Sequence, residues 1–576
     1  MKTQILPFTL LLTLLPFYTW ADSWKAGAAS VKITPDKPMW MAGYGSRKTP
    51  SQGKRTDLFA KALVLEDAAG NQGLILTMDL VGIGHPFALE LTKTLQEACG
   101  FSRAQIALCT SHTHSGPVVG RNLAPLHYWS VDPEQQKLID EYTDVLEEKL
   151  LGITKQAIAN LAPSRLQHGN GKCTFAVNRR ENKPYDTVPD RRAKGTLKGP
   201  VDHDVPVLSV RDAEGKLTAV LFGYACHATV LSATEWNGDY PGYAQEALEK
   251  AHPGAIALFW AGCGGDQNPL PRSEVELAVQ YGGDLAARVS DVLKAPMTEL
   301  DPTLVTGFRE IPLPLQKIPT AEELAKTAES TNRFEVARAN YLQRKMKREG
   351  AIGDTYPFPI GTWKLGKEID FVFLGGEVVV DYAVRLKRER RGTQTWVAAY
   401  ANDVMAYIPS KRVLLEGGLR RRWIECLLRT AFLVGRERGR SHHQGSRKPV
   451  GMSWKSIYDH IGGEANDLAF SPNGGKAKWI LLGIVVPIGI VWYAVRCWIH
   501  QEALWIGDRH SAMIVTGRTA NPVALCWFFA GLFMHFRWFW GLLPWHRVYD
   551  IGTVLSVLGF LAAGGVAFYE VMRFGA

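Results

Sequence analysis

Cysteine is sparse in this 576-residue sequence, which has eight cysteines, no CxxC pair and no dense cysteine framework. The spacing therefore predicts no set of disulfides that would hold a small fold together. An oxidising compartment would allow a disulfide, but no pairing can be assigned from the sequence.

Net positive charge is missing from most of the chain. Between Leu419 and Lys448 there are nine Lys or Arg against two Glu, which is +7 of the formal net charge of +10. The rest of the sequence is close to neutral. Because the basic balance is local, it does not indicate a nucleic-acid-binding surface, and we expect no nucleic-acid partner.

The N-terminal apolar stretch, MKTQILPFTLLLTLLPFYTWADS, is short for a membrane span. Lys2 gives it a charged start, and Thr19-Trp20-Ala21 forms a small-residue cleavage site. We predict a secretory signal peptide over residues 1–21, with an N-terminal membrane anchor as the alternative. Both interpretations predict that the region that follows is exported.

Residues 22–418 have the pattern of one globular α/β region. Short apolar strand candidates recur, among them LFAKALVLE, QIALCTS and AIALFWAG, and helical patterns lie between them. The clearest predicted helix runs from Thr320 to Glu349, where Thr320 and Glu323 form a capping box.

Long apolar runs are confined to the region after residue 478, apart from the N-terminal stretch. Three runs are each near the ~20 residues that a bilayer span needs: residues 479–495, 522–543 (interrupted by His535 and Arg537) and 551–569. We predict a membrane region over 479–576 with three transmembrane helices, preceded by a basic, irregular linker over 419–478. Buried helices of a soluble domain are the alternative.

Two histidines follow an apolar strand in IALCTSHTHSGP. Alternate residues of a strand face the same side, so this pattern predicts that His112 and His114 point together. Imidazole is the commonest metal ligand. Two structural histidines would give the same pattern, so the pair alone leaves both interpretations open.

Two further strand ends carry polar side chains. His227 ends the apolar run LTAVLFGYACH, and Gly264–Pro269 (GGDQNP) follows the run AIALFW. Ligand and catalytic sites of α/β proteins are built at strand ends. The three transitions together favour a functional site.

Glu377 and Tyr407 lie in apolar surroundings. Glu377 interrupts FVFLGGEVVVDY, and a buried carboxylate needs a metal or a cationic partner, of which Arg385 is the nearest in sequence. Tyr407 ends the apolar segment VAAYANDVMAY, where a core tyrosine is the simplest interpretation.

The order of these motifs resembles the catalytic domain of the neutral/alkaline non-lysosomal ceramidase family. The resemblance covers most of residues 25–418, with AGAASVKITPDKPMWMAGYG, SHTHSGP, VNRR, HAT…NGDYPGYA, GGE and YANDVMAYIPS in family order. It implies an α/β fold of mixed sheets layered with helices.

The resemblance also implies one Zn²⁺. Its ligands would be His112, His227, Glu377 and Tyr407. Two histidines and a carboxylate are a sound catalytic zinc set that leaves room for water, whereas the tyrosine rests on the resemblance alone. His114 would act as acid/base, and Arg179 would hold the substrate or the developing oxyanion. The implied reaction is amide hydrolysis by zinc-activated water.

The sequence departs from the family at Asn268. The corresponding family loop has a serine that is important for catalysis, and here GGDQNP places an amide there. Asn268 cannot be a nucleophile, but it can donate a hydrogen bond to an oxyanion. A water route survives, and ceramide becomes less certain as the substrate.

A second departure begins after Gly418. The family has an active-site tyrosine where this chain has Leu419, and its later segments are replaced by arginine-rich sequence. Codons can be chosen for GGLRRRWIECLL such that a shifted frame reads GGYEGGGSNVYY, which resembles the missing segment. We hypothesise a frameshift after Gly418, with a genuine fusion as the alternative; resequencing codons 415–425 decides between them.

Three functions remain open from the sequence. The first is an exported, membrane-anchored zinc hydrolase of amide bonds that acts on an N-acyl or lipid substrate. The second is a hydrolase of non-lipid N-acyl compounds on the same scaffold. The third is a non-catalytic, membrane-tethered ligand-binding protein. We predict about one zinc per chain, lost on replacing His112 or His227 by alanine, which separates the third from the others.

Overall fold

The computed structural model describes residues 23–315, 318–390, 392–416, 480, 484–506, 512–539 and 546–574. It divides into two compact units, Met1–Arg438 and Gly439–Ala576. The predicted signal peptide (1–21) and basic linker (419–478) lie outside the described residues, so both stay predictions.

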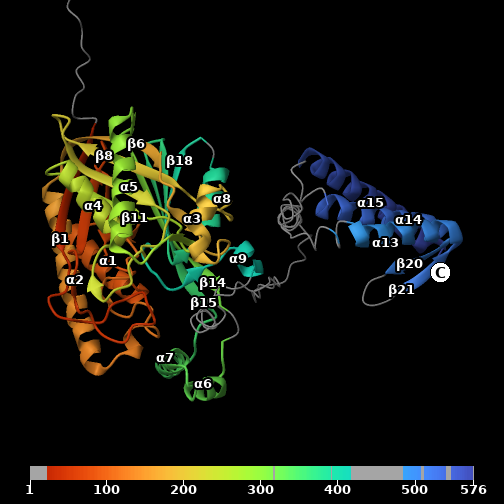
Figure 1. The fold of residues 1–576 in the computed structure, drawn as a ribbon, viewed down its shortest axis with the longest axis horizontal. Coiled ribbons are helices and arrows are strands. Elements are labelled where there is room, and N and C mark those ends of the chain that lie inside the picture. The colour runs from red at the N-terminus through yellow and green to blue at the C-terminus, as the bar shows by residue number, and fades with distance from the viewer. Residues whose placement is uncertain are drawn as a thin grey trace, which may run out of the picture. The chain divides into compact units, whose positions relative to one another are not determined.

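A nine-stranded mixed sheet forms the centre of the first unit (Figure 1). Across the sheet its strands are β11 (Ile256–Ala261), β9 (Leu217–Tyr224), β8 (Asp204–Arg211), β6 (Ala162–Lys172), β1 (Trp24–Lys32), β3 (Phe59–Glu66), β4 (Gln72–Met78) and β5 (Ile106–Thr110), with β13 (Thr298–Glu299) paired to β6. Pairing is antiparallel except at the two edges, where β11 is parallel to β9 and β5 is parallel to β4.

Helices cover one face of this sheet. They are α1 (His85–Cys99) and α2 (Pro133–Ala159) over one half and α4 (Asp239–Ala251) and α5 (Val275–Lys294) over the other. Alternation along the strands explains the two faces: in β3, Ala62 and Val64 pack with the helices, and Leu63 and Leu65 face the opposite side. Because a parallel pair needs a crossover connection, α1 and α4 lie between the strands of the two parallel pairs.

A four-stranded sheet packs on the opposite face. Its strands are β14 (Leu304–Pro314), β15 (Thr355–Leu365), β16 (Ile369–Leu374) and β18 (Gln394–Ala398). Phe371 and Phe373 are buried together with Leu221 and Leu258 of the large sheet. Helix α8 (Val380–Glu389) packs against β18 (Figure 1). The predicted α/β class with mixed sheets and helices is confirmed.

The segment after β18 joins the two edges of the large sheet. Ala398 forms a bridge with Gly262, just after β11, and Ala401 forms one with Cys109 in β5. The carboxyl ends of β5 and β11 therefore lie on either side of residues 398–401. Strands β5 and β11 are at opposite ends of the strand order, and these two bridges bring their carboxyl ends close together.

Short elements complete the region around these strand ends. They are the strand pairs β2 (Gly53–Lys54) with β10 (Glu235–Trp236), β7 (Ala176–Asn178) with β12 (Gln267–Pro269) and β17 (Glu377–Val378) with β19 (Tyr407–Ile408), and the helices α3 (Val188–Ala193) and α9 (Lys411–Glu416).

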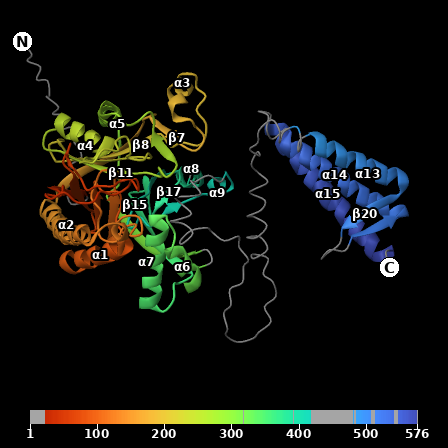
Figure 2. The same cartoon turned by 60° about the horizontal axis from the view of Figure 1, so that its bottom comes forward.

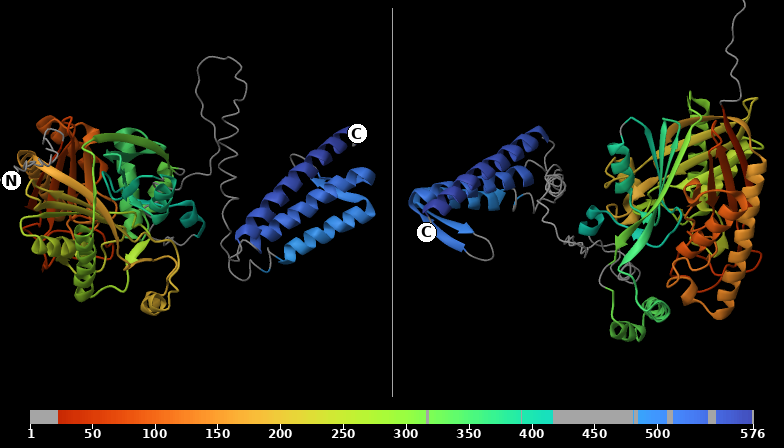
Figure 3. Two further views of the ribbon diagram at one scale, coloured as in Figure 1. Left: turned by 90° about the horizontal axis from the view of Figure 1, so that it is seen from above. Right: turned by 180° about the vertical axis from the view of Figure 1, so that it is seen from behind.

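The predicted single helix from Thr320 to Glu349 is wrong, because the segment forms two helices. They are α6 (Ala321–Ala328) and α7 (Arg333–Glu349), which extend away from the sheets (Figures 2 and 3). The capping box of Thr320 and Glu323 is present. A second start occurs because the Asn332 side chain accepts a hydrogen bond from the backbone N–H of Phe334 and caps α7.

The second unit contains α13 (Val486–His500), the hairpin of β20 (Glu502–Ile506) and β21 (Ala512–Thr516), α14 (Ala520–Trp538) and α15 (His546–Phe574). Each predicted apolar segment thus contains helix. Among the described residues, one helix, Gly517–Arg537, is long and apolar enough to cross a membrane, and Ile551–Ala567 is a shorter apolar helix. The predicted three spans are therefore not confirmed.

Candidate metal centre

His112 lies just after the carboxyl end of β5. It has φ +59°, in the left-handed region, so the chain is no longer extended there. The expectation that His112 and His114 are alternate residues of a strand was therefore wrong, because β5 ends at Thr110. The rings still converge, because this turn brings the two Nε2 atoms within 3.2 Å. The Nδ1 of His112 lies 2.6 Å from the carbonyl oxygen of Val81.

His227 lies at the equivalent end of β9 and is fully buried. Its Nδ1 lies 2.7 Å from the carbonyl oxygen of Gly264. Burial and then the charge of Arg179 lower the pKa of His227 to about 4, so the ring is neutral at pH 7. The single ring hydrogen of a neutral imidazole is then donated from Nδ1, and the lone pair of Nε2 faces the site.

Glu377 supplies a carboxylate between the two histidines. Its Oε2 lies 3.2 Å from the Nε2 of His112 and 3.2 Å from that of His227. Burial raises the pKa of Glu377, but the two histidines outweigh it and hold the pKa well below its usual range. The predicted alternative partner, Arg385, forms an ion pair with Glu389 instead.

Tyr407 and Arg179 complete this side of the site. The Tyr407 hydroxyl lies 3.3 Å from the Nε2 of His227 and accepts a hydrogen bond of 3.1 Å from Arg179. Arg179 also donates to the carbonyl oxygen of Gly265 at 2.7 Å. Burial raises the pKa of Tyr407, and Arg179 opposes the shift. Tyr407 is therefore part of this polar cluster, whereas the sequence alone had favoured a tyrosine of the apolar core.

His114 stands beside the cluster. Its ring packs 4.7 Å from the ring of Tyr44, and its Nδ1 is buried without a hydrogen-bond partner. Burial, and then His112 and His227, lower the pKa of His114 well below its usual value. A neutral ring with an open nitrogen can accept a proton and pass it on.

This donor set fits a cation. His112 and His227 both direct Nδ1 to a backbone carbonyl, so their Nε2 atoms face the carboxylate of Glu377. The ligand nitrogens of His112, His114 and His227 all lie within 4.8 Å of one another. Imidazole nitrogens and a buried carboxylate that converge in this way are the donors that a divalent metal such as zinc binds.

The sequence of this region matches a known family. Residues 24–275 match the family model described as neutral/alkaline non-lysosomal ceramidase, N-terminal. These residues belong to that family.

Individual relatives agree with this assignment of the ceramidase-family domain. The chain is 28% identical over 261 residues to neutral ceramidase of Drosophila melanogaster and 27% identical over 237 residues to that of Pseudomonas aeruginosa. The matches cover 43% and 40% of this chain, but only 36% and 34% of those relatives, about a third of their length.

A solved structure shows the same fold. The crystal structure of neutral ceramidase from Pseudomonas aeruginosa superposes with a TM-score of 0.52 at 21% identity, over 67% of this chain and 69% of that one. The ceramidase fold therefore extends beyond the matched residues 24–275.

The GGDQNP loop of the ceramidase-family domain reaches the site through its backbone. Gly265 donates its N–H to the carbonyl oxygen of Val378, and a Cβ at Gly265 would lie 2.7 Å from the carbonyl oxygen of Glu377, which requires glycine there. Asn268 pairs with Val177 between β12 and β7, and its Oδ1 lies 3.4 Å from Arg179. The Nδ2 hydrogens of Asn268 therefore face away from the guanidinium.

Sequence reasoning missed Tyr400. Its ring stacks on His112 with centroids 4.1 Å apart, and its hydroxyl is buried without a hydrogen-bond partner. The residue lies in the quoted YANDV motif, two residues after β18, where the two sheets meet. Tyr400 lies over His112 because residues 398–401 form bridges to both edges of the large sheet, and the sequence pattern does not encode these contacts.

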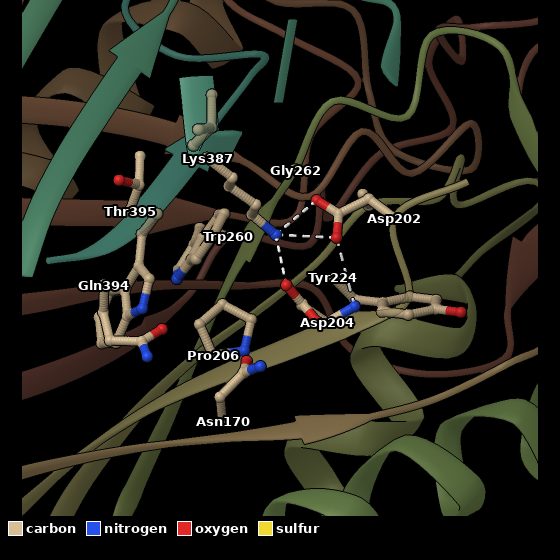
Figure 4. A pocket seen from close by; sticks show the side chains of 13 residues that line it. Asn170, Asp202, Asp204, Pro206, Tyr224, Trp260, Gly262, Lys387, Gln394 and Thr395 are labelled. Atoms are coloured by element: carbon tan, nitrogen blue, oxygen red, sulfur yellow. Dashed lines mark hydrogen bonds and ion pairs between the residues drawn. The ribbon is translucent and has the colours of Figure 1, made fainter. Parts of the chain in front are cut away.

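A polar pocket lies beside the ends of β9 and β11 (Figure 4). Lys387 from α8 donates to the carboxylates of Asp202 and Asp204 at 2.8 Å and so ties α8 to the chain that enters β8. Trp260 lines the wall. None of the seven residues predicted for the site lines this pocket, and its charges are paired with one another.

Proposed function

We propose that the ceramidase-like region, residues 22–418, hydrolyses the amide bond of an N-acyl substrate with the help of one zinc ion. The observation that carries the proposal is the convergence of the Nε2 atoms of His112 and His227 on the carboxylate of Glu377, each at 3.2 Å from its Oε2. The hydroxyl of Tyr407 would be the fourth ligand.

Zinc suits this set because it favours imidazole nitrogen and carboxylate oxygen in four-coordinate sites. When bound, zinc supplies Lewis acidity, which polarises a carbonyl and lowers the pKa of water. Glu377 holds the charge of the site, and the carbonyls of Val81 and Gly264 hold the two imidazoles in one orientation.

Different side chains would transfer protons and stabilise negative charge. His114 is neutral and has an open Nδ1, so it would take a proton from the attacking water and return one to the leaving amine. Arg179 would stabilise negative charge on the carbonyl oxygen, and Asn268 would add a donor through Nδ2. The amide side chain of Asn268 cannot form an acyl intermediate.

Two observations point to different substrate classes. Their names as neutral ceramidases favour a lipid amide of the ceramide type. Asn268 in place of the family serine favours the second candidate, a non-lipid N-acyl substrate on the same scaffold. We also propose that the region is exported and anchored through the second unit, an interpretation favoured by the apolar helix Gly517–Arg537.

The test is a turnover assay on the full chain with a fluorescent ceramide and a panel of non-lipid N-acyl amides, with and without a chelator. Hydrolysis of either class that the chelator removes and zinc restores supports the proposal. Chelator-independent hydrolysis, or zinc bound without any turnover of either class, would contradict it and favour a binding protein.

A further inference from the structure

One turn contacts both loops that carry the ligand histidines. It is Asn237–Tyr240 (NGDY), which follows β10 and includes the first two residues of α4. Asn237, Asp239 and Tyr240 are each at most 1% exposed. The proposed metal ligands His112 and His227 follow β5 and β9, which are not neighbours in the sheet. Their separation therefore depends on what connects the two loops.

The turn holds the His227 loop on both sides of the ligand. Tyr240 donates its hydroxyl to the carbonyl oxygen of Cys226 at 2.8 Å. Asp239 accepts hydrogen bonds from the backbone N–H groups of Val230 and Leu231 at 3.2 and 2.9 Å. His227 is thus fixed from the preceding residue and from the loop that follows it.

The same turn holds the His112 loop. The Thr113 hydroxyl donates to the carbonyl oxygen of Asn237 at 2.9 Å, and the N–H of Asn237 donates to the carbonyl oxygen of Ser115 at 3.2 Å. Thr113 is the residue directly after His112 and is fully buried.

Asp239 carries an unusual combination for a residue with only a packing role. It has φ +54°, in the left-handed region, which aspartate and asparagine adopt more readily than most residues other than glycine. Its carboxylate is buried, accepts three backbone N–H groups (those of Val230, Leu231 and Tyr240) and forms no ion pair within the described residues. Because two of its three donors belong to the His227 loop, this buried carboxylate ties the conformation of that loop to the turn.

We propose that the Asn237–Tyr240 turn sets the distance between His112 and His227, with Asp239 as its positioning residue for the metal. This inference rests on the proposed metal site. Asp239 touches neither substrate nor metal; it acts by fixing the loop from which His227 reaches the site, in the way that hydrogen-bonded supporting groups orient metal ligands.

The experiment compares Asp239→Asn with Asp67→Asn in the full chain. Asp67 is a matched control, because it is 5% exposed and also accepts three backbone N–H groups, those of Ala69, Asn71 and Leu304, in the β3–β4 hairpin and at the start of β14. The probe is Co²⁺, with its affinity measured by chelator competition and its coordination by visible absorption; the melting temperature is measured on the metal-free proteins.

The expected result is a fall of about 10–100-fold in Co²⁺ affinity and an altered absorption spectrum for Asp239→Asn. Both variants are expected to lower the melting temperature of the metal-free protein by similar amounts. Asp67→Asn is expected to leave the Co²⁺ affinity and the spectrum unchanged. Equal Co²⁺ affinity and spectrum in the two variants would overturn the inference while leaving the metal site intact. A wild-type chain that binds no Co²⁺ would overturn the metal site and this inference together.

Thr113 provides a second route if Asp239→Asn does not fold. Thr113→Val keeps the shape and removes the hydrogen bond to Asn237, so Co²⁺ affinity should fall, and Thr113→Ser should restore it. Unchanged affinity in Thr113→Val, or no recovery in Thr113→Ser, would overturn the inference.

Discussion

The Oε2 of Glu377 lies 3.2 Å from the Nε2 of His227, whose Nδ1 is turned to the carbonyl oxygen of Gly264. A neutral His227 donates its ring hydrogen from Nδ1 to Gly264, which leaves the lone pair of Nε2 toward the carboxyl group. Two acceptors at this distance repel each other unless a cation lies among them. This relationship supports the proposed metal site.

Glu377→Gln should remove most of the metal affinity. The amide keeps the shape of the side chain but removes the negative charge, so we expect a fall of at least about 10-fold in zinc affinity, the lower end of what a supporting group costs. Hydrolysis should fall with it. Chelator competition measures the affinity, with Glu389→Gln, in the exposed pair with Arg385, as the control. Equal affinities in the two variants would contradict a ligand role for Glu377.

Asn268→Ala should slow hydrolysis without abolishing it. Removing one oxyanion donor costs about 10²–10³-fold in kcat, whereas removing a nucleophile would leave only background activity. Asn268→Ser should show a similar partial loss, because a water and not residue 268 attacks. Complete loss in Asn268→Ala with normal zinc content would contradict this role, as would a burst of acyl-enzyme in Asn268→Ser.

Arg412→Ala should destabilise the GGDQNP loop. Arg412 donates to the buried carboxylate of Asp266 at 2.6 Å, and removing it leaves that charge without a cation. We expect a loss of about 3 kcal/mol in the free energy of unfolding, against less than about 1 kcal/mol for Arg385→Ala at the exposed pair. Denaturant titration measures both. Equal losses would show that Asp266 does not depend on Arg412.

Asp403 should make stability depend on pH near neutrality. Burial raises its pKa to about 7, with Tyr356 donating to the carboxylate and Glu310 nearby. Because this pKa lies above the unfolded value, the native state binds the proton more tightly. The contribution of Asp403 to stability is full below about pH 4 and is lost as the pH rises through about 7.

Asp403→Asn removes this titration. Between pH 5 and pH 8, the wild type should lose free energy of unfolding relative to Asp403→Asn, measured by denaturant titration at each pH. The same pH slope in both proteins would show that Asp403 does not titrate in this range.

Local patterns predicted the strand ends well. The apolar runs before His112, His227 and the GGDQNP loop are the edge-region strands β5, β9 and β11. The carboxyl ends of parallel strands collect functional side chains, so the pattern was sufficient to group these three segments.

Contacts between distant segments could not be predicted in the same way. Tyr400 stacks on His112 because the chain after β18 bridges both edges of the large sheet, a relationship that no periodicity encodes. The turn at Asp239 also depends on tertiary structure, since its partners lie in the loop after β9. The break before α7 was missed because the helical pattern continues through Asn332, whose capping role depends on backbone geometry.

The most direct test of the metal site is the zinc content of the purified full chain, measured by inductively coupled plasma mass spectrometry beside His112→Ala, His227→Ala and the distant control His252→Ala. The predicted result is about one zinc per chain in the wild type and in His252→Ala, and none in the other two. A wild-type chain without metal, or zinc retained in both His112→Ala and His227→Ala, would contradict the account.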